Sequence, residues 1–232
     1  MFEMERLEQI LALLRQTQTA TVKKLSTHLY VSEATVRRDL NELERRGFVR
    51  RIHGGVVLID GVSREVPLYL REQQNVEAKR LIAAKAAKYL RDGQVIFMDA
   101  SSTAMYLIPY FEQFKNLTVI TNGLKTSQEL RPLNHTVYCT GGLMLHNSLA
   151  YIGDYATDFI RRFNADLFFF SSLGISEEGM ITDSSAEETG IRRVMFEQSR
   201  RRIFLCDNSK RGKLYCYNLC HISQADDDIS DS

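Results

Sequence analysis

Five short apolar runs alternate with helical runs along the second part of the chain, and this alternation constrains the fold more than any other feature. The β-prone runs are QVIFMD, LTVIT, TVYCT, LFFFS and RIFLCD, and a stretch with helical periodicity precedes each of them. Strands that alternate with helices through short connections favour a mostly parallel sheet with helices on both faces. We therefore predict an α/β domain over residues 76–232.

The first 59 residues follow a different pattern. Apolar residues at i, i+3, i+4 and i+7 predict a helix over about residues 4–16, and a second, shorter helix covers residues 22–29. Ser32 is a favourable N-cap for a third helix, which runs to Gly47. FVRRI and VVLI, joined by a turn that begins at His53 and contains two glycines, predict a β-hairpin. Residues 1–59 are thus predicted to form a winged helix-turn-helix.

The face of the third helix opposite Val36, Leu40 and Leu43 carries arginine and asparagine. Between Lys23 and Arg51, eight Lys and Arg residues stand against four acidic ones. Such a helix fits the major groove of DNA, where Arg donates to guanine and Asn bonds adenine, while a basic wing meets phosphate. The alternative is a solvated face whose arginines pair with acids on the same helix, namely Glu33, Asp39, Glu42 and Glu44. The capped helix, the preceding turn and the basic hairpin together favour DNA recognition.

The stretch VSEATVRRDLNELERRGFVRRIHGG also closely resembles the DNA-binding signature of the DeoR family of bacterial transcription regulators. The resemblance extends through the second domain to about residue 213. It implies that the recognition helix carries Ser32, Thr35, Arg37, Arg38 and Asn41. It also implies that the wing carries Arg50, Arg51 and His53.

Residues 60–75 mix Gly, Pro and charge and are predicted to be a linker with a short helix after Pro67. Beyond it, three strand ends carry polar residues or glycines, and ligands of such sheets bind at the carboxyl ends of strands. They contribute Asp99, Ser101, Ser102 and Thr103 from MDASSTAMYL, Asn122 from TNG, and Gly141 and Gly142 from CTGG. Lys210 adds a positive charge. Each residue alone has an ordinary explanation as a helix cap, a turn or a surface lysine, but together they predict an anion site.

The family resemblance implies that the second domain is similar to the ribose-5-phosphate isomerase and CoA-transferase fold and responds to phosphorylated sugars. Asp99 to Thr103 match the family's Asp-x-Gly-Ser-Thr loop, with Ser101 in place of the usual glycine, and Lys210 matches its Asp-x-Ser-Lys. Relatives usually continue through a further strand and helix, so HISQADDDISDS is expected to be a disordered remnant.

Two other groups of residues have a chemical and a structural interpretation. Glu187 is a candidate contact to sugar hydroxyls, while Glu188 and Arg192, four residues apart, predict a surface ion pair. The run from Cys216 to His221 resembles a metal motif only partly, because no second pair of ligands accompanies it. The four cysteines are therefore expected to be reduced, buried thiols, and no metal or cofactor is expected.

The chain of 232 residues has no apolar run near the roughly 20 residues that a bilayer demands, and its first residues are acidic rather than basic. We expect a cytoplasmic protein without membrane contact. The predicted function is a transcription regulator, a repressor of a carbohydrate-metabolism operon, that binds double-stranded operator DNA as a homodimer or homotetramer and responds to a phosphorylated sugar. The alternative is a sugar-phosphate isomerase-like enzyme with a nucleic-acid-binding anchor, in which Asp99 acts as a base.

Overall fold

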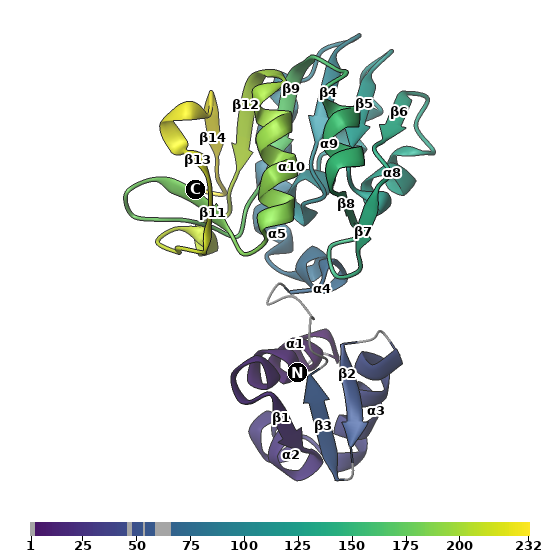
Figure 1. Cartoon of the computed structure of the whole chain (residues 1–232), viewed down its shortest axis with the longest axis vertical. Coiled ribbons are helices and arrows are strands. Elements are labelled where there is room, and N and C mark those ends of the chain that lie inside the picture. Colours follow the sequence, from purple (N-terminus) through teal and green to yellow (C-terminus); the bar gives the residue numbers. More distant parts are fainter. Residues whose placement is uncertain (1–2, 46–47, 53, 59–65) are drawn as a thin grey trace. The chain divides into compact units, whose positions relative to one another are not determined.

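The computed structural model describes residues 3–45, 48–52, 54–58 and 66–232, with the side chain of Arg15 left out. The chain divides into two compact units, Met1–Val66 and Pro67–Ser232 (Figure 1).

The first unit combines helices with a small antiparallel sheet. Its helices are α1 (Glu3–Thr17), α2 (Val22–Leu29) and α3 (Glu33–Arg45), and its strands are β1 (Thr19–Thr21), β2 (Val49–Ile52) and β3 (Gly55–Leu58). The strands are ordered β1-β3-β2. The predicted winged helix-turn-helix is thus confirmed, with β1 as an additional strand. Three residues are too few to show a period of two, and β1 exists because it pairs with β3.

The turn between β2 and β3 depends on its glycines. Gly54 has a φ of +74°, a conformation that glycine adopts without strain. At Gly55, a Cβ atom would lie 2.6 Å from the carbonyl oxygen of Ala20, so only glycine lets β1 approach this closely. The predicted turn residue His53 and the predicted helix end at Gly47 lie outside the described residues.

The second unit is built on a parallel sheet with the order β14-β12-β9-β4-β5-β6. Its strands are β4 (Val95–Met98), β5 (Thr118–Thr121), β6 (Thr136–Cys139), β9 (Ala165–Phe170), β12 (Ser199–Leu205) and β14 (Asp227–Ile229). Its principal helices are α4 (Leu68–Gln73), α5 (Val76–Ala86), α6 (Ser102–Met105), α7 (Ile108–Phe111), α8 (Leu124–Leu130), α9 (Asp154–Ile160) and α10 (Ala186–Glu197). Short 3₁₀ turns cover Ala87–Tyr89, Asn208–Lys210 and Ile222–Gln224.

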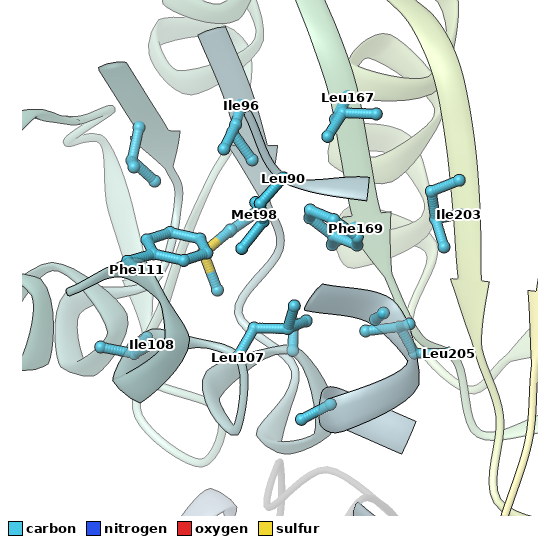
Figure 2. Packing of buried hydrophobic residues seen from close by; sticks show 14 of the residues in the cluster. Leu90, Ile96, Met98, Leu107, Ile108, Phe111, Leu167, Phe169, Ile203 and Leu205 are labelled. Atoms are coloured by element: carbon cyan, nitrogen blue, oxygen red, sulfur yellow. The ribbon is translucent and has the colours of Figure 1, made fainter. Parts of the chain in front are cut away.

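Successive residues of the central strands point to opposite faces of the sheet, and each face has its own core. Met98 and Phe169 pack with Phe111 of α7 and with α5 on one face (Figure 2). Their neighbours Phe97 and Phe168 pack on the other face, which α9 and α10 cover (Figure 1). The predicted parallel α/β architecture with helices on both faces is confirmed.

Several small elements were not predicted. β7 (Leu143–Leu145) and β8 (Ala150–Ile152) form a hairpin, and β10 (Gly174–Ile175), β11 (Met180–Asp183) and β13 (Tyr217–His221) form an antiparallel sheet. The expectation of a disordered tail is wrong, because Asp227–Ile229 pair in parallel with β12 and Ile229 is only 5% exposed. Burying Ile229 over the sheet edge outweighs the solubility of the aspartates around it.

Residues 67–75, placed in a linker by their composition, belong to the second unit because Leu68 and Leu70 are buried there. All four cysteines are free, but only Cys206 and Cys220 are buried as expected. Cys139 is half-buried, and Cys216 is exposed because β13 begins only after it. In the part of the chain that the structure describes, no cluster of His, Cys, Asp or Glu has the arrangement of a metal site. No described helix is long and apolar enough to cross a membrane.

Candidate nucleic-acid interface

Helix α3 is fixed by its cap and by one buried stripe. The hydroxyl of Ser32 accepts a hydrogen bond from the amide of Thr35 at 3.1 Å, which is the N-cap that the sequence predicts. Val36, Leu40 and Leu43 are fully buried. The opposite face, with Arg37, Arg38 and Asn41, is therefore exposed.

The charges on this face are only partly paired. Arg37 contacts Glu33 at 2.8 Å and Arg45 contacts Glu42 at 2.7 Å, as the alternative interpretation expected. Arg38 makes no hydrogen bond or ion pair with another residue that the structure describes. Exposed ion pairs are worth about 0–1 kcal/mol, so a phosphate or a guanine can displace Glu33 from Arg37 at little cost.

Asp39 does not belong to the exposed face. It is 1% exposed and accepts two hydrogen bonds from Arg6 of α1, at 2.7 and 2.9 Å. The hydrogen bond to Asp39 raises the pKa of Arg6, against the effect of its burial. This bidentate pair ties α1 to α3, so the expectation that Asp39 pairs with the surface arginines is wrong.

The wing contacts the recognition helix directly. Nη1 of Arg51 donates to Oδ1 of Asn41 at 2.9 Å, and its backbone amide donates to Glu44 at 2.8 Å. Arg50, its neighbour on β2, is exposed. These contacts place Arg51 and Asn41 on one continuous surface. If Asn41 recognises an adenine, the amino group of the base has to replace Arg51 as the hydrogen-bond donor to Oδ1 of Asn41.

Candidate effector site

The polar groups predicted at the strand ends gather at the carboxyl edge of the parallel sheet. Asp99 follows β4, Asn122 follows β5, and Lys210 follows β12. Ser171, which the sequence analysis did not single out, follows β9, the strand between β4 and β12. Because these strands are parallel and adjacent, their carboxyl ends lie side by side.

Asp99 is a fully engaged hydrogen-bond acceptor. Its Oδ1 accepts from the amide of Ser101 at 3.1 Å, and its Oδ2 accepts from the amide of Ser171 at 3.1 Å and from Nε of Arg192 at 2.9 Å. The carboxylate therefore fixes the loop after β4 against the end of β9. Because these donors already occupy both of its oxygens, Asp99 is poorly placed to reach a proton of a substrate, which weakens the isomerase alternative.

Arg192 lies at the centre of a buried group of carboxylates. Besides Asp99, it contacts Asp183 at 2.8 Å and Glu188 at 2.9 Å, and all four side chains are at most 5% exposed. Burial alone would lower the pKa of Arg192, but the three carboxylates outweigh it and raise that pKa. The predicted surface pair of Glu188 and Arg192 is therefore wrong in its location, because this side of α10 faces the sheet.

In the serine-rich loop after β4, one hydroxyl group caps a helix and another has no described hydrogen-bond partner. The hydroxyl of Ser101 caps α6 by accepting from the amide of Ala104 at 3.2 Å. Ser102 and Thr103 begin this single helical turn and are also buried. The hydroxyl of Ser102 makes no hydrogen bond with another described residue.

Lys210 reaches back across the sheet edge to this loop. Its ammonium donates to the hydroxyl of Ser171 at 2.7 Å and lies 3.5 Å from that of Thr103 and 3.8 Å from the carboxylate of Asp207. The side chain is 18% exposed, and burial lowers its pKa. The structure thus brings together the Asp-x-Ser-Lys lysine and the loop that begins at Asp99.

Sequence reasoning missed a second lysine. Lys79 of α5 is 3% exposed, and its ammonium donates to the carbonyl oxygens of Gln74, at 2.7 Å, and Arg71. Burial and then the like charge of Lys210 lower the pKa of Lys79 to about 8. Arg71 of α4 acts electrostatically on both lysines. Three cations therefore lie within electrostatic reach of one another.

Three further predicted residues, Gly141, Gly142 and Glu187, make no described hydrogen bond or ion pair with these cations. Gly141 and Gly142 have φ values of +65° and +113°, and a Cβ on Gly142 would lie 2.8 Å from the carbonyl oxygen of Ile152. Gly142 also lines a surface hollow of about 800 Å³ between β7 and α9. Glu187 is exposed at the start of α10, where its carboxylate accepts a hydrogen bond from Ser185 at 3.0 Å. No described hydrogen bond joins these three residues to Lys210.

Comparisons with known proteins cover both units. The model of the DeoR-like helix-turn-helix domain matches residues 6–62, and that of the DeoR C-terminal sensor domain matches residues 74–232. The HTH-type transcriptional regulator GolR of Listeria innocua is 36% identical over all of this chain and 92% of its own length. The glycerol-3-phosphate regulon repressor of Escherichia coli is 29% identical over 97% of this chain and 90% of its own length.

Solved structures match mainly the α/β architecture. The delta subunit of eIF2B from Chaetomium thermophilum has a TM-score of 0.52 at 16% identity, over 71% of this chain and 59% of that chain. A ribose 5-phosphate isomerase from Methanocaldococcus jannaschii has a TM-score of 0.46 at 15% identity, over 61% of this chain and 57% of that chain.

Proposed function

The chain belongs to the DeoR family of transcription regulators, and we propose that it represses a carbohydrate-metabolism operon until a phosphorylated sugar bound at the carboxyl edge of its sheet releases the operator. The exposed arginine and asparagine face of α3 carries this proposal, since α3 is the recognition element of the helix-turn-helix. Arg37 and Arg38 are assigned to base edges.

Other residues of the first unit complete the contact to double-stranded DNA. Ser32 and Thr35, at the start of α3, are positioned for backbone phosphates, and Asn41 for adenine. Arg50 and Arg51 carry the charge of the wing. The wing residue His53, also expected to bind DNA, lies outside the described residues.

The effector is assigned to the cations at the edge of the second unit. Lys210 is held beside the hydroxyls of Thr103 and Ser171, and Lys79 and Arg71 add charge nearby. A dianionic phosphate suits such a site because it offsets like charges that are otherwise brought close together in a partly buried place. One relative's name, the glycerol-3-phosphate regulon repressor, includes a phosphorylated compound of this kind.

Release of DNA requires two states of the protein. A ligand shifts an equilibrium only as far as its affinity differs between the states, so the effector must bind better to a form that fits the operator poorly. A single winged helix reads few base pairs, and two or four copies of the chain on repeated half-sites would supply the missing affinity. Phosphate binding would then change how paired α3 helices match their half-sites.

Fluorescence anisotropy on the DNA upstream of the protein's own gene tests both halves of the proposal. Replacing Arg38 by Ala should weaken specific binding by about 1–3 kcal/mol, whereas replacing the exposed Arg161, which follows α9, by Ala should leave binding unchanged. One phosphorylated sugar, but not its unphosphorylated parent, should release the wild-type protein. Equal affinity of R38A and R161A, or equal affinity for random DNA at two salt concentrations, would refute DNA recognition by α3.

The isomerase alternative is tested in the same preparation. Asp99 is the base that this alternative requires, and its oxygens are occupied by Ser101, Ser171 and Arg192. We therefore expect no turnover of ribose 5-phosphate by the purified protein. Measurable turnover that disappears in D99N would favour the enzyme.

A further inference from the structure

Among the buried polar atoms that make no hydrogen bond with any described residue, three belong to chain segments that meet near the carboxyl edge of the sheet. They are Oε1 of Glu188, Oγ of Ser148 and Oδ1 of Asn122. The three residues are 3%, 1% and 3% exposed. Buried polar atoms are nearly always hydrogen-bonded in folded proteins, so three of them at one place indicate a surface built for polar groups of a ligand.

The three residues come from separate elements that the structure holds together. Asn122 exchanges hydrogen bonds with Tyr151 of β8, and its neighbour Gly123 forms a bridge with Ala150, so the end of β5 lies against the chain just after Ser148. The Ser148 hydroxyl lies close enough to Glu188 to act on its carboxylate as a hydrogen-bond donor and lower its pKa, but Oγ of Ser148 and Oε1 of Glu188 do not reach the geometry of a full hydrogen bond.

This group also lies near the cations assigned to the phosphate. Arg71 of α4 acts electrostatically on both Glu188 and Lys210. The amide of Leu68, at the start of α4, donates to the carbonyl of Asn147 at 2.8 Å, which ties α4 to the residue before Ser148. Helix α4 therefore connects the two groups of residues, through the charge of Arg71 and through the hydrogen bond at Leu68.

The chemistry of the three atoms limits what can bind them. Burial would raise the pKa of Glu188, but Arg192 and Arg71 outweigh it and keep that pKa below its ordinary value. Glu188 is therefore ionised at neutral pH, and both Oε1 of Glu188 and Oδ1 of Asn122 only accept hydrogen bonds. A ligand must offer them donors, and a ligand carboxylate would be repelled by Glu188.

We propose that Glu188, Ser148 and Asn122 form a hydroxyl-recognition subsite, which selects phosphorylated compounds with at least two free hydroxyl groups and rejects phosphorylated carboxylic acids. The subsite rests on the proposed function, because it presumes that a phosphorylated effector occupies the cations at Lys210. It assigns to Glu188 the sugar contact that the sequence suggested for Glu187.

Isothermal titration calorimetry on the full chain tests the subsite with matched probes. Glucitol 6-phosphate is compared with 6-phosphogluconate, and glycerol 3-phosphate with 3-phosphoglycerate, because the members of each pair differ only in a CH2OH group against a carboxylate. The wild type should bind the hydroxyl-bearing member of at least one pair about tenfold or more tightly than its acid. Replacing Glu188 by Gln keeps the size of the side chain and its acceptor for Arg192, but it removes the charge and adds an amide donor.

In E188Q, the affinity for the preferred probe should fall about tenfold to a hundredfold, which corresponds to the loss of one hydrogen bond to a charged group. The ratio of the affinities for the hydroxyl-bearing probe and for its acid should also become smaller. S148A should bind the same probe roughly threefold to tenfold more weakly. E187Q changes an exposed carboxylate one residue away and should bind as the wild type does. Inorganic phosphate, which lacks hydroxyl groups on carbon, should bind all four proteins alike.

The outcomes separate the subsite from the proposed function. If sugar phosphates bind and release DNA but E188Q and S148A match E187Q, the subsite is wrong and the regulator proposal stands. If the wild type binds the acids as well as the hydroxyl-bearing probes, the subsite is also wrong. If no phosphorylated probe binds the wild type, the effector half of the proposed function fails and the subsite fails with it. Circular dichroism confirms folding, and S148A supplies the test should E188Q not fold.

Discussion

Replacing Arg192 by Met should destabilise the second unit strongly and in a pH-dependent way. The substitution keeps a long side chain in place but leaves Asp99, Asp183 and Glu188, each at most 3% exposed, without their shared cation. Removing one partner of a buried ion pair costs about 3–5 kcal/mol, because the remaining charge stays buried and unpaired. The variant can relieve this cost only by taking up a proton on at least one carboxyl group.

The free energy needed to protonate this carboxyl group depends on pH, and it determines how the stability of the variant changes with pH. An Asp with an unfolded pKa of about 3.9 that must be protonated in the folded state at pH 7 costs about 4 kcal/mol of stability. At pH 5 the same protonation costs about 1.5 kcal/mol. The folded pKa of this group is raised above its unfolded value, so the variant recovers stability as the pH falls from 7 to 5. We therefore expect R192M to lose about 4 kcal/mol at pH 7 and about 1.5 kcal/mol at pH 5.

Urea unfolding followed by tyrosine fluorescence measures this loss in the intact chain. The protein has no tryptophan, and of its ten tyrosines only Tyr30 lies in the first unit, so the signal reports the second. Arg193 is the matched control, because it is exposed and its one described hydrogen bond is to the carbonyl of Asn218. R193M should stay within about 1 kcal/mol of the wild type. A loss in R192M that equals that of R193M, or that does not change between pH 5 and pH 7, would refute the reasoning.

Three further predictions concern other parts of the molecule. Arg6→Ala leaves Asp39 buried and unpaired, so the free energy of unfolding of the first unit should fall by about 3 kcal/mol, measured by far-ultraviolet circular dichroism, whereas Arg80→Ala on α5 should leave this unit unchanged. The pKa of Lys79 is lowered to about 8, so calorimetry should show phosphate binding weaken by up to about tenfold per pH unit above pH 8, and K79M should lose this dependence. In the unfolded chain Lys79 titrates near pH 10.4, so between pH 8 and pH 10.4 the unfolded state binds more protons than the folded state. The free energy of unfolding should therefore rise over this range. Ile229→Asp should release β14 and lower the thermal midpoint by several degrees, whereas an unchanged thermal midpoint in this variant would contradict the packing of Ile229 on the sheet.

The main architecture could be predicted because it depends on periodicity within single segments. The apolar stripe of α1 and the short, continuous apolar runs of β4 and β9 each indicate their element, and right-handed parallel connections then restrict the topology. β1 and β14 escaped prediction because each has three residues, and such strands are defined by the neighbour they pair with, β3 and β12. Neither partner can be read from the local sequence.

The effector site was predicted in part, and the residues that were missed share one feature of their positions in the helices. Asp99 and Lys210 were found because they stand at strand ends, but Lys79, Glu188 and Arg192 lie on helices and were missed or placed on the surface. Each of them nevertheless shares the buried stripe of its helix. Lys79 precedes Ile82, Ala83 and Ala86 with the same i, i+3, i+4, i+7 spacing that the leucines and isoleucine of α1 show.

In α10 the positions with this spacing are Glu188, Ile191, Arg192 and Met195, so both members of the supposed surface pair occupy core positions. The i, i+4 spacing of a salt bridge is the same on either face of a helix, and it therefore cannot distinguish a solvated pair from a buried one. The flanking apolar residues can distinguish the two cases, because a charged residue on the same stripe as buried apolar residues must either be paired inside the protein or face a ligand. By this criterion, Lys79 and Glu188 in this chain are predictable as members of a polar site from the sequence alone.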